Sequence, residues 1–424
     1  MRSDLPTRAD ITQYSSKVRT LNPEDTRFDD FEVLAEVVSD AKIVGVGESA
    51  HFVTEFGMAR ARISRFLIER CGFTHVALEL GHCEARRLNP WIRGEGSESD
   101  LSTRAGPLTI GLYGRFLKWL RAFNASTSRT VQLLGPDLPN TLTILDDLSS
   151  LHTYLNVVDP DSLPILAEAM GYGTQIRGQS AVMSAGAWLA ISEQDRNALS
   201  ARLTRLLVRM QSLKTSYLER DSADRYEDAV ISIESAIHTE QMLRSMSELF
   251  AGTAIPGDTS IRDLHTATIL LKLCIRLQPE ARILFVAHNN HIQKTRVSFS
   301  GELTAYPAGH FLYKKLGDGY RSIGLTHTDK TVPEMNFPAP NSEVGFTVDM
   351  LPLESAPSGS IEQALIESHL GRDITITNLS LNEDGTLGLS QIRSQSAYIV
   401  TPLHDAFDAV LAVPSISREM DLPF

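Results

Sequence analysis

The sequence predicts an α/β fold in which a mostly parallel central sheet is flanked by helices. Short apolar and β-branched runs at residues 42–46, 74–80 and 131–134 have the composition of buried strands. Between them, apolar residues such as Phe56, Ile63 and Phe66 recur at helical spacing. Strands that alternate with helices are typical of βαβ units, whose strands lie parallel in one sheet. We therefore expect a single α/β domain over residues 1–424.

Residues 141–257 follow a different pattern, because helix succeeds helix without an intervening strand. Two apolar stripes recur there at helical spacing, one from Leu199 to Tyr217 and one from Tyr226 to Ile237. Such stripes usually pack inside a core, but these helices could also roof a cleft that is large enough for a bulky substrate. We predict a helical insertion or cap at residues 141–257, over the active-site cleft.

The C-terminal part contains further strand-like segments at residues 282–287, 320–325, 397–401 and 409–413. A proline-containing, loop-rich stretch at residues 329–343 could mark a domain boundary. Because strands return after it, we expect the chain to re-enter the same sheet.

Composition excludes several classes of partner. Lys and Arg number 40 against 52 Asp and Glu, which gives a net charge of −12, so no overall basic field would attract nucleic acid. No apolar run approaches the roughly 18 residues of a membrane span, and the first residues lack the apolar core of a secretory signal. We expect a cytoplasmic protein without a membrane partner. Its 3 cysteines have no CxxC spacing and predict neither disulfides nor a structural zinc site.

Titratable residues directly follow three of the predicted strands. Glu48 and His51 follow the first strand, Glu79 follows the second, and His288 and His291 follow the strand at residues 282–287. Open α/β sheets bind their ligands at the carboxyl ends of the strands, where these side chains would meet. The pattern therefore indicates acid/base chemistry on a bound molecule.

His51 is the preferred general base of this predicted site. The pKa of a free imidazole, about 6.5, suits it to deprotonate water. A carboxylate on the second ring nitrogen would fix the tautomer, and either Glu48 or Glu79 could supply it. Ser49 could instead act as a nucleophile, but residues two apart seldom present to one another as a triad requires, and no GxSxG motif occurs. We favour activated water.

Other interpretations of the same residues stay open. The spacing Gly45-x-Gly47-x-x-Ala50 resembles a dinucleotide-binding turn, although Glu48 would place a negative charge in the phosphate site. The pair His288-x-x-His291 could bind a transition metal together with a glutamate. Arg262 could stabilise an oxyanion, or it could simply form a surface salt bridge with Asp263 or another acid.

Longer motifs extend these patterns over nearly the whole chain. They are Gly47-Glu48-Ser49-Ala50-His51-Phe52-Val53-x-Glu55-Phe56, Ala77-Leu78-Glu79, Leu112-Tyr113-Gly114, Gly178-Gln179-Ser180-Ala181-Val182, Arg262-Asp263, Ala287-His288-Asn289-Asn290-His291-x-Gln293-Lys294-Thr295 and Ser298-Phe299-Ser300-Gly301-Glu302-Leu303-Thr304-Ala305. With these motifs in this order, between about residues 29 and 413, the chain resembles the erythromycin esterases, especially the type A branch.

The resemblance implies hydrolysis of the lactone ester of 14-membered macrolides, which opens the ring and destroys the antibiotic. It implies one α/β unit with a helical portion beside the site, and it aligns His51 with the proposed general base. The other implied site positions are the acidic Glu48 and Glu79 and the basic Arg262, His288 and His291. One departure lies after Arg262-Asp263, where Leu264-His265 replaces a common Met-Ala and makes substrate scope less certain than reaction type.

Our leading hypothesis is a macrolide esterase that needs no metal or other cofactor and whose partner is the small-molecule macrolide. The alternatives are a metal-dependent form of the same hydrolase, an enzyme of secondary metabolism that cleaves another ester or eliminates a group, and a macrolide-binding protein without catalysis. The glutamate cluster speaks against the last, because binding a neutral lactone needs no such charges. The sequence determines neither the accepted macrolides nor the oligomeric state.

Overall fold

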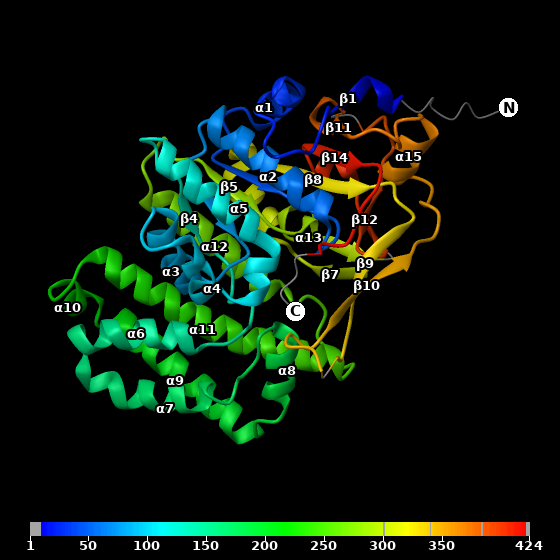
Figure 1. Cartoon of the computed structure of the whole chain (residues 1–424). Coiled ribbons are helices and arrows are strands. Elements are labelled where there is room, and N and C mark those ends of the chain that lie inside the picture. Colours follow the sequence, from blue (N-terminus) through cyan, green and yellow to red (C-terminus); the bar gives the residue numbers. More distant parts are fainter. Residues whose placement is uncertain (1–9, 300–301, 340, 383–384, 421–424) are drawn as a thin grey trace.

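The computed structural model describes residues 10–299, 302–339, 341–382 and 385–420 (Figure 1). Within these residues an eight-stranded sheet has the order β1-β11-β14-β8-β2-β5-β3-β4. The strands from β14 to β4 are mutually parallel, whereas β11 is antiparallel to both β14 and β1. The predicted α/β fold with a mostly parallel sheet is confirmed. Its strands are β1 (Ser15–Lys17), β2 (Ile43–Val46), β3 (His75–Leu78), β4 (Gln132–Leu134), β5 (Ile283–Val286), β8 (Tyr320–His327), β11 (Thr375–Asn378) and β14 (Ala409–Val413).

Helices cover both faces of this sheet because its strands are apolar on both sides. On β2, Val44 and Val46 join one hydrophobic cluster and Ile43 joins the other, as the alternation of a strand requires. The first cluster is covered by α1 (Glu32–Val38), α2 (Thr54–Glu69), α3 (His82–Ile92), α4 (Leu101–Arg104) and α5 (Pro107–Ser126). The second is covered by α12 (Ser260–Arg276), α13 (Asn289–Ile292), α14 (Ala308–Leu316), α15 (Ile361–Glu367) and α16 (Leu403–Ala406).

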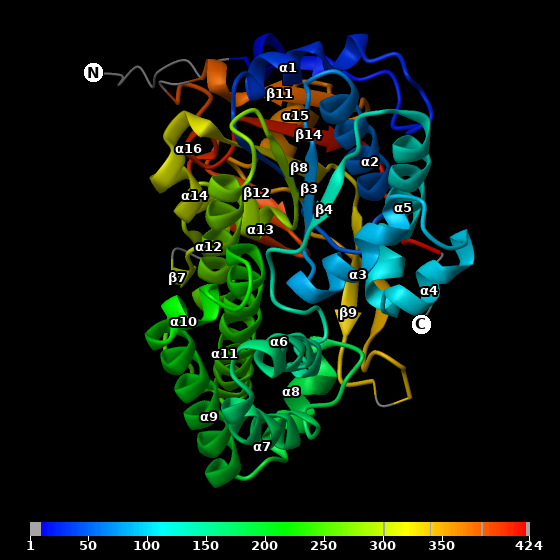
Figure 2. The same cartoon turned by 90° about the vertical axis from the view of Figure 1, so that its left-hand side faces the viewer.

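A helical region lies beside the sheet, below it in both Figure 1 and Figure 2. Its helices are α6 (Leu145–Val158), α7 (Leu163–Gly173), α8 (Ala181–Leu189), α9 (Glu193–Ser212), α10 (Lys214–Leu218) and α11 (Ala223–Phe250). Both predicted apolar stripes are buried in the region's own core, where Leu203 and Ile233 are among the members. The stripes therefore serve packing. The region leaves the sheet after β4 and returns at the start of α12, so it adjoins the carboxyl edge of the sheet.

Two smaller sheets account for the remaining strands and correct part of the prediction. An antiparallel pair is formed by β9 (Thr331–Asn336) and β10 (Thr347–Pro352), so the loop-rich stretch at residues 329–343 contains a strand. A four-stranded sheet has the order β12 (Gln391–Ser394), β13 (Ala397–Val400), β6 (Val297–Phe299) and β7 (Glu302–Ala305). Whereas β8 and β14 join the central sheet as expected, β13 does not. Strand propensity depends on a strand's neighbours and does not identify its partner.

Short 3-10 helices connect several of these elements, at Ile11–Tyr14, Asp29–Phe31, Glu98–Asp100, Pro160–Ser162, Gly317–Gly319 and Leu379–Leu381. None of the described helices combines the length and the apolar composition that crossing a membrane requires.

Helix α2 is anchored to the N-terminal segment by a fully buried arginine. The Arg62 guanidinium is 0% exposed and donates to both carboxylate oxygens of Asp30, at 2.8 and 3.0 Å. It also donates to the carbonyl oxygens of Thr20 and Arg27, each at 2.8 Å, and it lies over the ring of Phe31. These contacts satisfy the buried charge and hold residues 20–31 against α2.

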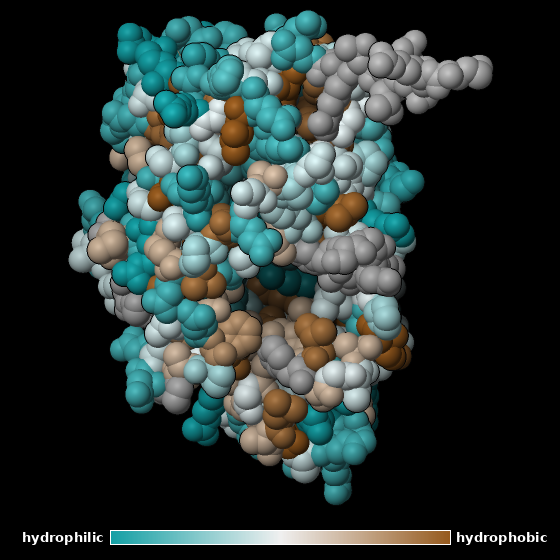
Figure 3. Space-filling view, turned by 90° about the vertical axis from the view of Figure 1, so that its right-hand side faces the viewer, coloured by the Kyte–Doolittle hydropathy of each residue, from teal (hydrophilic) through white to brown (hydrophobic). Residues whose placement is uncertain are grey.

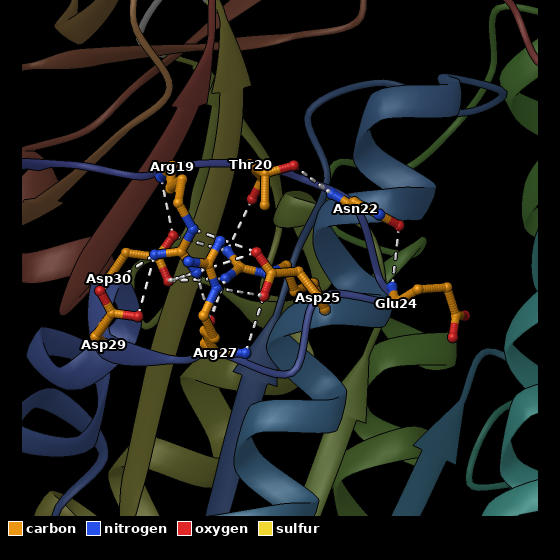
Figure 4. A network of polar contacts seen from close by, with 9 residues as sticks. Arg19, Thr20, Asn22, Glu24, Asp25, Arg27, Asp29 and Asp30 are labelled. Atoms are coloured by element: carbon orange, nitrogen blue, oxygen red, sulfur yellow. Dashed lines mark hydrogen bonds and ion pairs between the residues drawn. The ribbon is translucent and has the colours of Figure 1, made fainter.

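A more exposed network continues outward from Asp30 along the same segment (Figure 4). The Arg19 guanidinium donates to Asp29 at 3.1 Å and to Asp25 at 3.1 Å, while the Arg19 amide donates to Asp30 at 2.9 Å. Hydrogen bonds from the Arg27 amide and the Arg19 side chain lower the pKa of Asp25 to about 2. This network fixes the local turn but is only partly shielded from water.

Replacement of Arg62 by alanine should strongly destabilise the protein. The variant Arg62→Ala leaves Asp30 without its buried partner, and breaking a buried pair of this kind costs about 3–5 kcal/mol. Urea unfolding followed by circular dichroism measures this loss. The matched control Arg19→Ala should lose less, because the Arg19 side chain is 31% exposed. Equal losses in both variants would contradict the assignment of Arg62 as the anchor.

Candidate active site

The carboxyl ends of three adjacent parallel strands carry the predicted site residues. In the sheet β5 lies between β2 and β3, with Val286 level with both Val46 and Leu78. The segments that follow these strands therefore meet at one edge, as the sequence predicted. Glu48 and His51 follow β2, Glu79 follows β3, and His288 and His291 follow β5. Arg262 joins them from the first turn of α12.

The loop after β2 approaches the loop after β5 so closely that a glycine is required. A Cβ atom at Gly47 would overlap the side-chain oxygen of Asn289. The Asn289 amide donates to the Glu48 carbonyl at 2.8 Å, and its side-chain nitrogen donates to the Leu325 carbonyl at 2.8 Å. The Gly47 position thus allows the two loops to pair through their backbones.

His51 and Glu48 form a direct hydrogen bond. His51 Nδ1 lies 2.8 Å from Glu48 Oε1, and the other carboxylate oxygen lies 2.9 Å from the Arg60 guanidinium. Glu48 is 2% exposed, whereas the His51 side chain is 27% exposed. Of the two glutamates left open by the sequence, Glu48 is therefore the one that can fix the tautomer of His51. This hydrogen bond occupies Nδ1 of His51 and leaves its Nε2 as the other ring nitrogen.

Arg60 was not predicted as a site residue, although its place on α2 gave a signal. It lies four residues after Phe56 and three before Ile63, and hence on the buried face of an amphipathic helix. A charged residue on such a face needs a buried partner. Only the three-dimensional structure identifies that partner as Glu48.

His288 packs against His51 and stays neutral. The two ring centroids lie 4.9 Å apart, and His288 is 4% exposed. Burial, followed by the nearby His51 and His291, lowers the pKa of His288 well below its ordinary value. His288 Nδ1 accepts a hydrogen bond from the Asn290 amide at 3.1 Å, so the single proton of the neutral ring resides on Nε2.

Glu79 belongs to a second cluster, built around Arg262. The Arg262 guanidinium lies 3.3 Å from Glu79 and binds both oxygens of Asp137, with Nε at 2.9 and 3.1 Å. Although burial opposes it, this guanidinium lowers the pKa of Asp137. Tyr113 donates to Glu79 at 3.3 Å, and burial together with Glu79 raises the pKa of Tyr113 well above its ordinary value. Tyr113 therefore stays protonated.

The structure argues against the alternative that Arg262 forms only a salt bridge at the protein surface. The acids that bind its guanidinium are Asp137 and Glu79, which are 3% and 5% exposed, so the ion pair does not belong to the protein surface. Asp137 follows β4 as Glu79 follows β3, and the two ends meet in a bridge between Gly81 and Asp137. In the sequence, Asp137 ends the run Gly135-Pro136-Asp137, whose composition is that of a turn and gives no sign of a charged partner.

His291 lies between two carboxylates. Its Nδ1 is 2.8 Å from Asp263, and its Nε2 is 3.6 Å from Glu79. Asp263 is also fixed by the Ala308 amide, at 2.9 Å. Burial lowers the pKa of His291, but the charge and hydrogen bond of Asp263 outweigh burial, and the pKa is raised. Unlike His288, His291 is thus prepared to carry a positive charge.

The structure gives less support to two alternatives from the sequence. Ser49 Oγ is buried without a hydrogen-bond partner in the described part of the chain, so no base contacts it. Within the described ranges, no group of three His, Cys, Asp or Glu side chains is arranged to hold a metal ion. The two histidines instead have separate partners: His288 packs against the ring of His51, whereas His291 contacts Asp263.

The departure after Arg262 and Asp263 affects the surroundings of the site in two different ways. Leu264 is 48% exposed, whereas His265 is buried and lies 2.9 Å from His238 of α11. His265 therefore contributes to the contact between α12 and the helical region.

One face of the molecule is hollowed. Figure 3 shows the hollow near the middle of this face, with hydrophilic residues visible in its depth and hydrophobic residues mainly along its lower side. In the site itself, the side chains of His51, His291 and Arg262 are 27%, 22% and 28% exposed. These groups can therefore be reached by a molecule from outside.

An accessible histidine held by a buried carboxylate, beside an arginine and a second histidine at the edge of an α/β sheet, is an arrangement that suits acid/base catalysis. Comparison with known proteins agrees. The family model described as "Erythromycin esterase" matches residues 68–416, and the chain belongs to this family of ester hydrolases.

Relatives of known name resemble this chain over nearly its full length. It is 38% identical over 399 residues to erythromycin esterase type I from Escherichia coli, with 94% of this chain and 97% of the relative covered. It is 29% identical over 415 residues to erythromycin esterase type II from Escherichia coli, with 94% and 95% covered. A solved structure of a histidine-to-asparagine mutant of the erythromycin esterase EreC, in its open conformation, matches with a TM-score of 0.92. That match has 38% identity and covers 97% of this chain and 100% of the other.

The variant Asp263→Asn should lower the pKa of His291. Removal of the carboxylate charge leaves burial as the largest influence, and burial disfavours the imidazolium. An NMR titration of the histidine ring protons, with the His291 signal assigned from a His291→Gln variant, measures the shift. The exposed His152 supplies an internal control whose titration should not change. A pKa of His291 that stays raised in the variant would contradict the role given to Asp263.

Proposed function

We propose that this protein hydrolyses the lactone ester of 14-membered macrolides such as erythromycin and so inactivates the antibiotic. Family membership over most of the chain supports the reaction class. The observation that carries the mechanism is the 2.8 Å hydrogen bond between the accessible His51 and the buried Glu48. This pair provides a base whose Nδ1 is occupied and whose Nε2 is left for water.

In the first step, His51 Nε2 takes a proton from water while the oxygen of that water adds to the lactone carbonyl carbon. Glu48 stabilises the imidazolium that forms, and Arg60 holds the second carboxylate oxygen of Glu48 in place. In the second step, the acyl C–O bond of the tetrahedral intermediate breaks, and the imidazolium returns its proton to the departing alkoxide. The products are a carboxylic acid and an alcohol within one opened chain, heavier than the substrate by one water.

Two side chains of the second cluster, Arg262 and His291, would stabilise the negative charge of the tetrahedral intermediate. Arg262 is a permanent cation, and His291 has a raised pKa. Neutral His288 packs beside His51 without bringing a further positive charge next to it. Fixed donors and cations of this kind stabilise an oxyanion because they need no reorganisation during the reaction.

We propose the hollow in Figure 3 as the entrance for the macrolide. The hydrophobic residues along its lower side would contact the mostly apolar ring, and the hydrophilic residues in its depth would surround the ester. The cytoplasmic location stays a prediction from the sequence.

The variant His51→Ala should lose at least about 100-fold in kcat, which is the lower end of the contribution of a general base. Turnover is measured by mass spectrometry of a series of 14- and 16-membered macrolides, in which the product gains one water. The control His152→Ala replaces an exposed histidine of α6 and should keep the wild-type rate. Full activity of His51→Ala would exclude His51 as the base, and an inactive wild type would refute the proposed substrate class.

The variant Ser49→Ala should keep most of the wild-type kcat. The Ser49 hydroxyl is buried and has no base beside it in the described residues, so the mechanism uses water directly. Steady-state kinetics with erythromycin test this, with the His51→Ala protein as the inactive reference. Loss of activity in a folded Ser49→Ala protein, or a covalent acyl-enzyme in its wild-type counterpart, would instead support a serine nucleophile.

A further inference from the structure

The turn between β12 and β13 reaches the loop that carries the general base. Ser394 pairs with Ala397 across the hairpin, which leaves Gln395 and Ser396 as a two-residue turn. Gln395 has a φ of 53°, in the left-handed region that favours glycine at such a position. A glutamine here strains the backbone, so its side-chain contacts are of special interest.

Every polar atom of the Gln395 side chain is used. The side-chain Oε1 accepts a hydrogen bond from the His51 backbone amide at 2.8 Å. In addition, the backbone amide of Gln395 donates to the Ser49 carbonyl at 2.6 Å. Its Nε2 donates to the Pro333 carbonyl and to Glu334 Oε2, both at 3.2 Å. The orientation of the side-chain amide is therefore fixed, because a flip would oppose donor to donor and acceptor to acceptor.

The same turn also contacts the loop that carries the other histidines. Ser394 Oγ lies 3.0 Å from the side-chain oxygen of Asn290, between His288 and His291 in the chain. On the His51 side, the next residue, Phe52, has a φ of 61°, which is strained for an aromatic residue. The backbone around His51 thus adopts a conformation that needs support from outside its own loop.

We propose that Gln395 is a positioning residue for the esterase reaction, which holds the His51 backbone so that the imidazole stays on Glu48 and faces the substrate. This inference rests on the proposed function and adds a residue that lies more than 300 positions away in the chain. Gln395 acts through the His51 amide and does not itself contact the reacting atoms. Glu334, by accepting from Gln395 Nε2 and from the Ser396 amide, fixes the turn in its place.

The variant Gln395→Gly separates positioning from stability. Glycine suits the positive φ and so offsets part of the stability that is lost with the three side-chain hydrogen bonds, and the variant should still fold and unfold cooperatively on heating. Without the side chain, kcat should fall about 10- to 100-fold, because a small misplacement of a catalytic group costs this much, while KM changes little. Hydrogen exchange followed by mass spectrometry should show faster exchange in a peptide that contains the His51 amide. The control Ser396→Ala, on the exposed neighbour in the turn, should change none of these quantities.

A paired exchange of the two side chains tests the hydrogen bonds themselves. In Gln395→Glu the new carboxylate still accepts from the His51 amide, but it opposes Glu334 and should lower kcat. Adding Glu334→Gln restores a donor opposite that carboxylate and leaves an oxygen for the Ser396 amide. The double variant should therefore recover part of the activity that Gln395→Glu loses, because the Pro333 carbonyl still faces a carboxylate oxygen.

Wild-type kcat in a folded Gln395→Gly protein would overturn the proposal, and so would unchanged exchange at the His51 amide. Failure of the double variant to recover activity would overturn it as well. Hydrogen exchange needs no substrate, so it reports on Gln395 even if wild-type protein does not turn over macrolides. An inactive wild type refutes the proposed function, whereas an active wild type with an equally active Gln395→Gly refutes only the role of Gln395.

Discussion

The burial of Glu48 is the constraint on which the site depends. A carboxylate that is 2% exposed is stable only if charged or hydrogen-bonded partners replace water, and here His51 takes one oxygen while Arg60 takes the other. Arg60 in turn requires α2 to begin directly after the His51 loop and to present one face to the sheet. Arg62, two residues further along, fastens the same helix to the N-terminal segment through Asp30. The loop that carries His51 is thus connected to the core through two paired buried charges, Glu48 with Arg60 and Arg62 with Asp30.

The charged and titratable side chains of the site form two groups, one around His51 and one around Arg262. Around His51, the neutral His288 provides a partner that does not compete for positive charge, because burial lowers its pKa. Around Arg262, the carboxylates of Asp137 and Glu79 compensate the guanidinium, and Asp263 raises the pKa of His291. The proposed mechanism needs a neutral imidazole and cationic side chains close together, and these two sets of contacts place them at one sheet edge.

The site also joins parts of the chain that lie far apart in sequence. The loops after β2 and β5 pair through Asn289, and the turn between β12 and β13 closes over them through Gln395 and Ser394. Strand β9 contacts the same turn, because Gln395 Nε2 donates to the Pro333 carbonyl and to Glu334, each at 3.2 Å. The smaller sheets, which do not continue the central one, thus serve to support its functional edge.

The sequence by itself determined the α/β class, because buried parallel strands and amphipathic helices have recognisable periods, and it determined which residues follow the strand ends. Glu48 and His51 lie three residues apart in one loop, so their proximity was also local information. Only the tertiary structure decided that Glu48 and not Glu79 binds His51, that Asp137 and Arg60 neutralise the buried charges, and that β13 belongs to a separate sheet. These outcomes depend on which distant backbones pack together, and a hydrogen bond between residues hundreds of positions apart, such as Gln395 to His51, leaves no periodic trace in the chain.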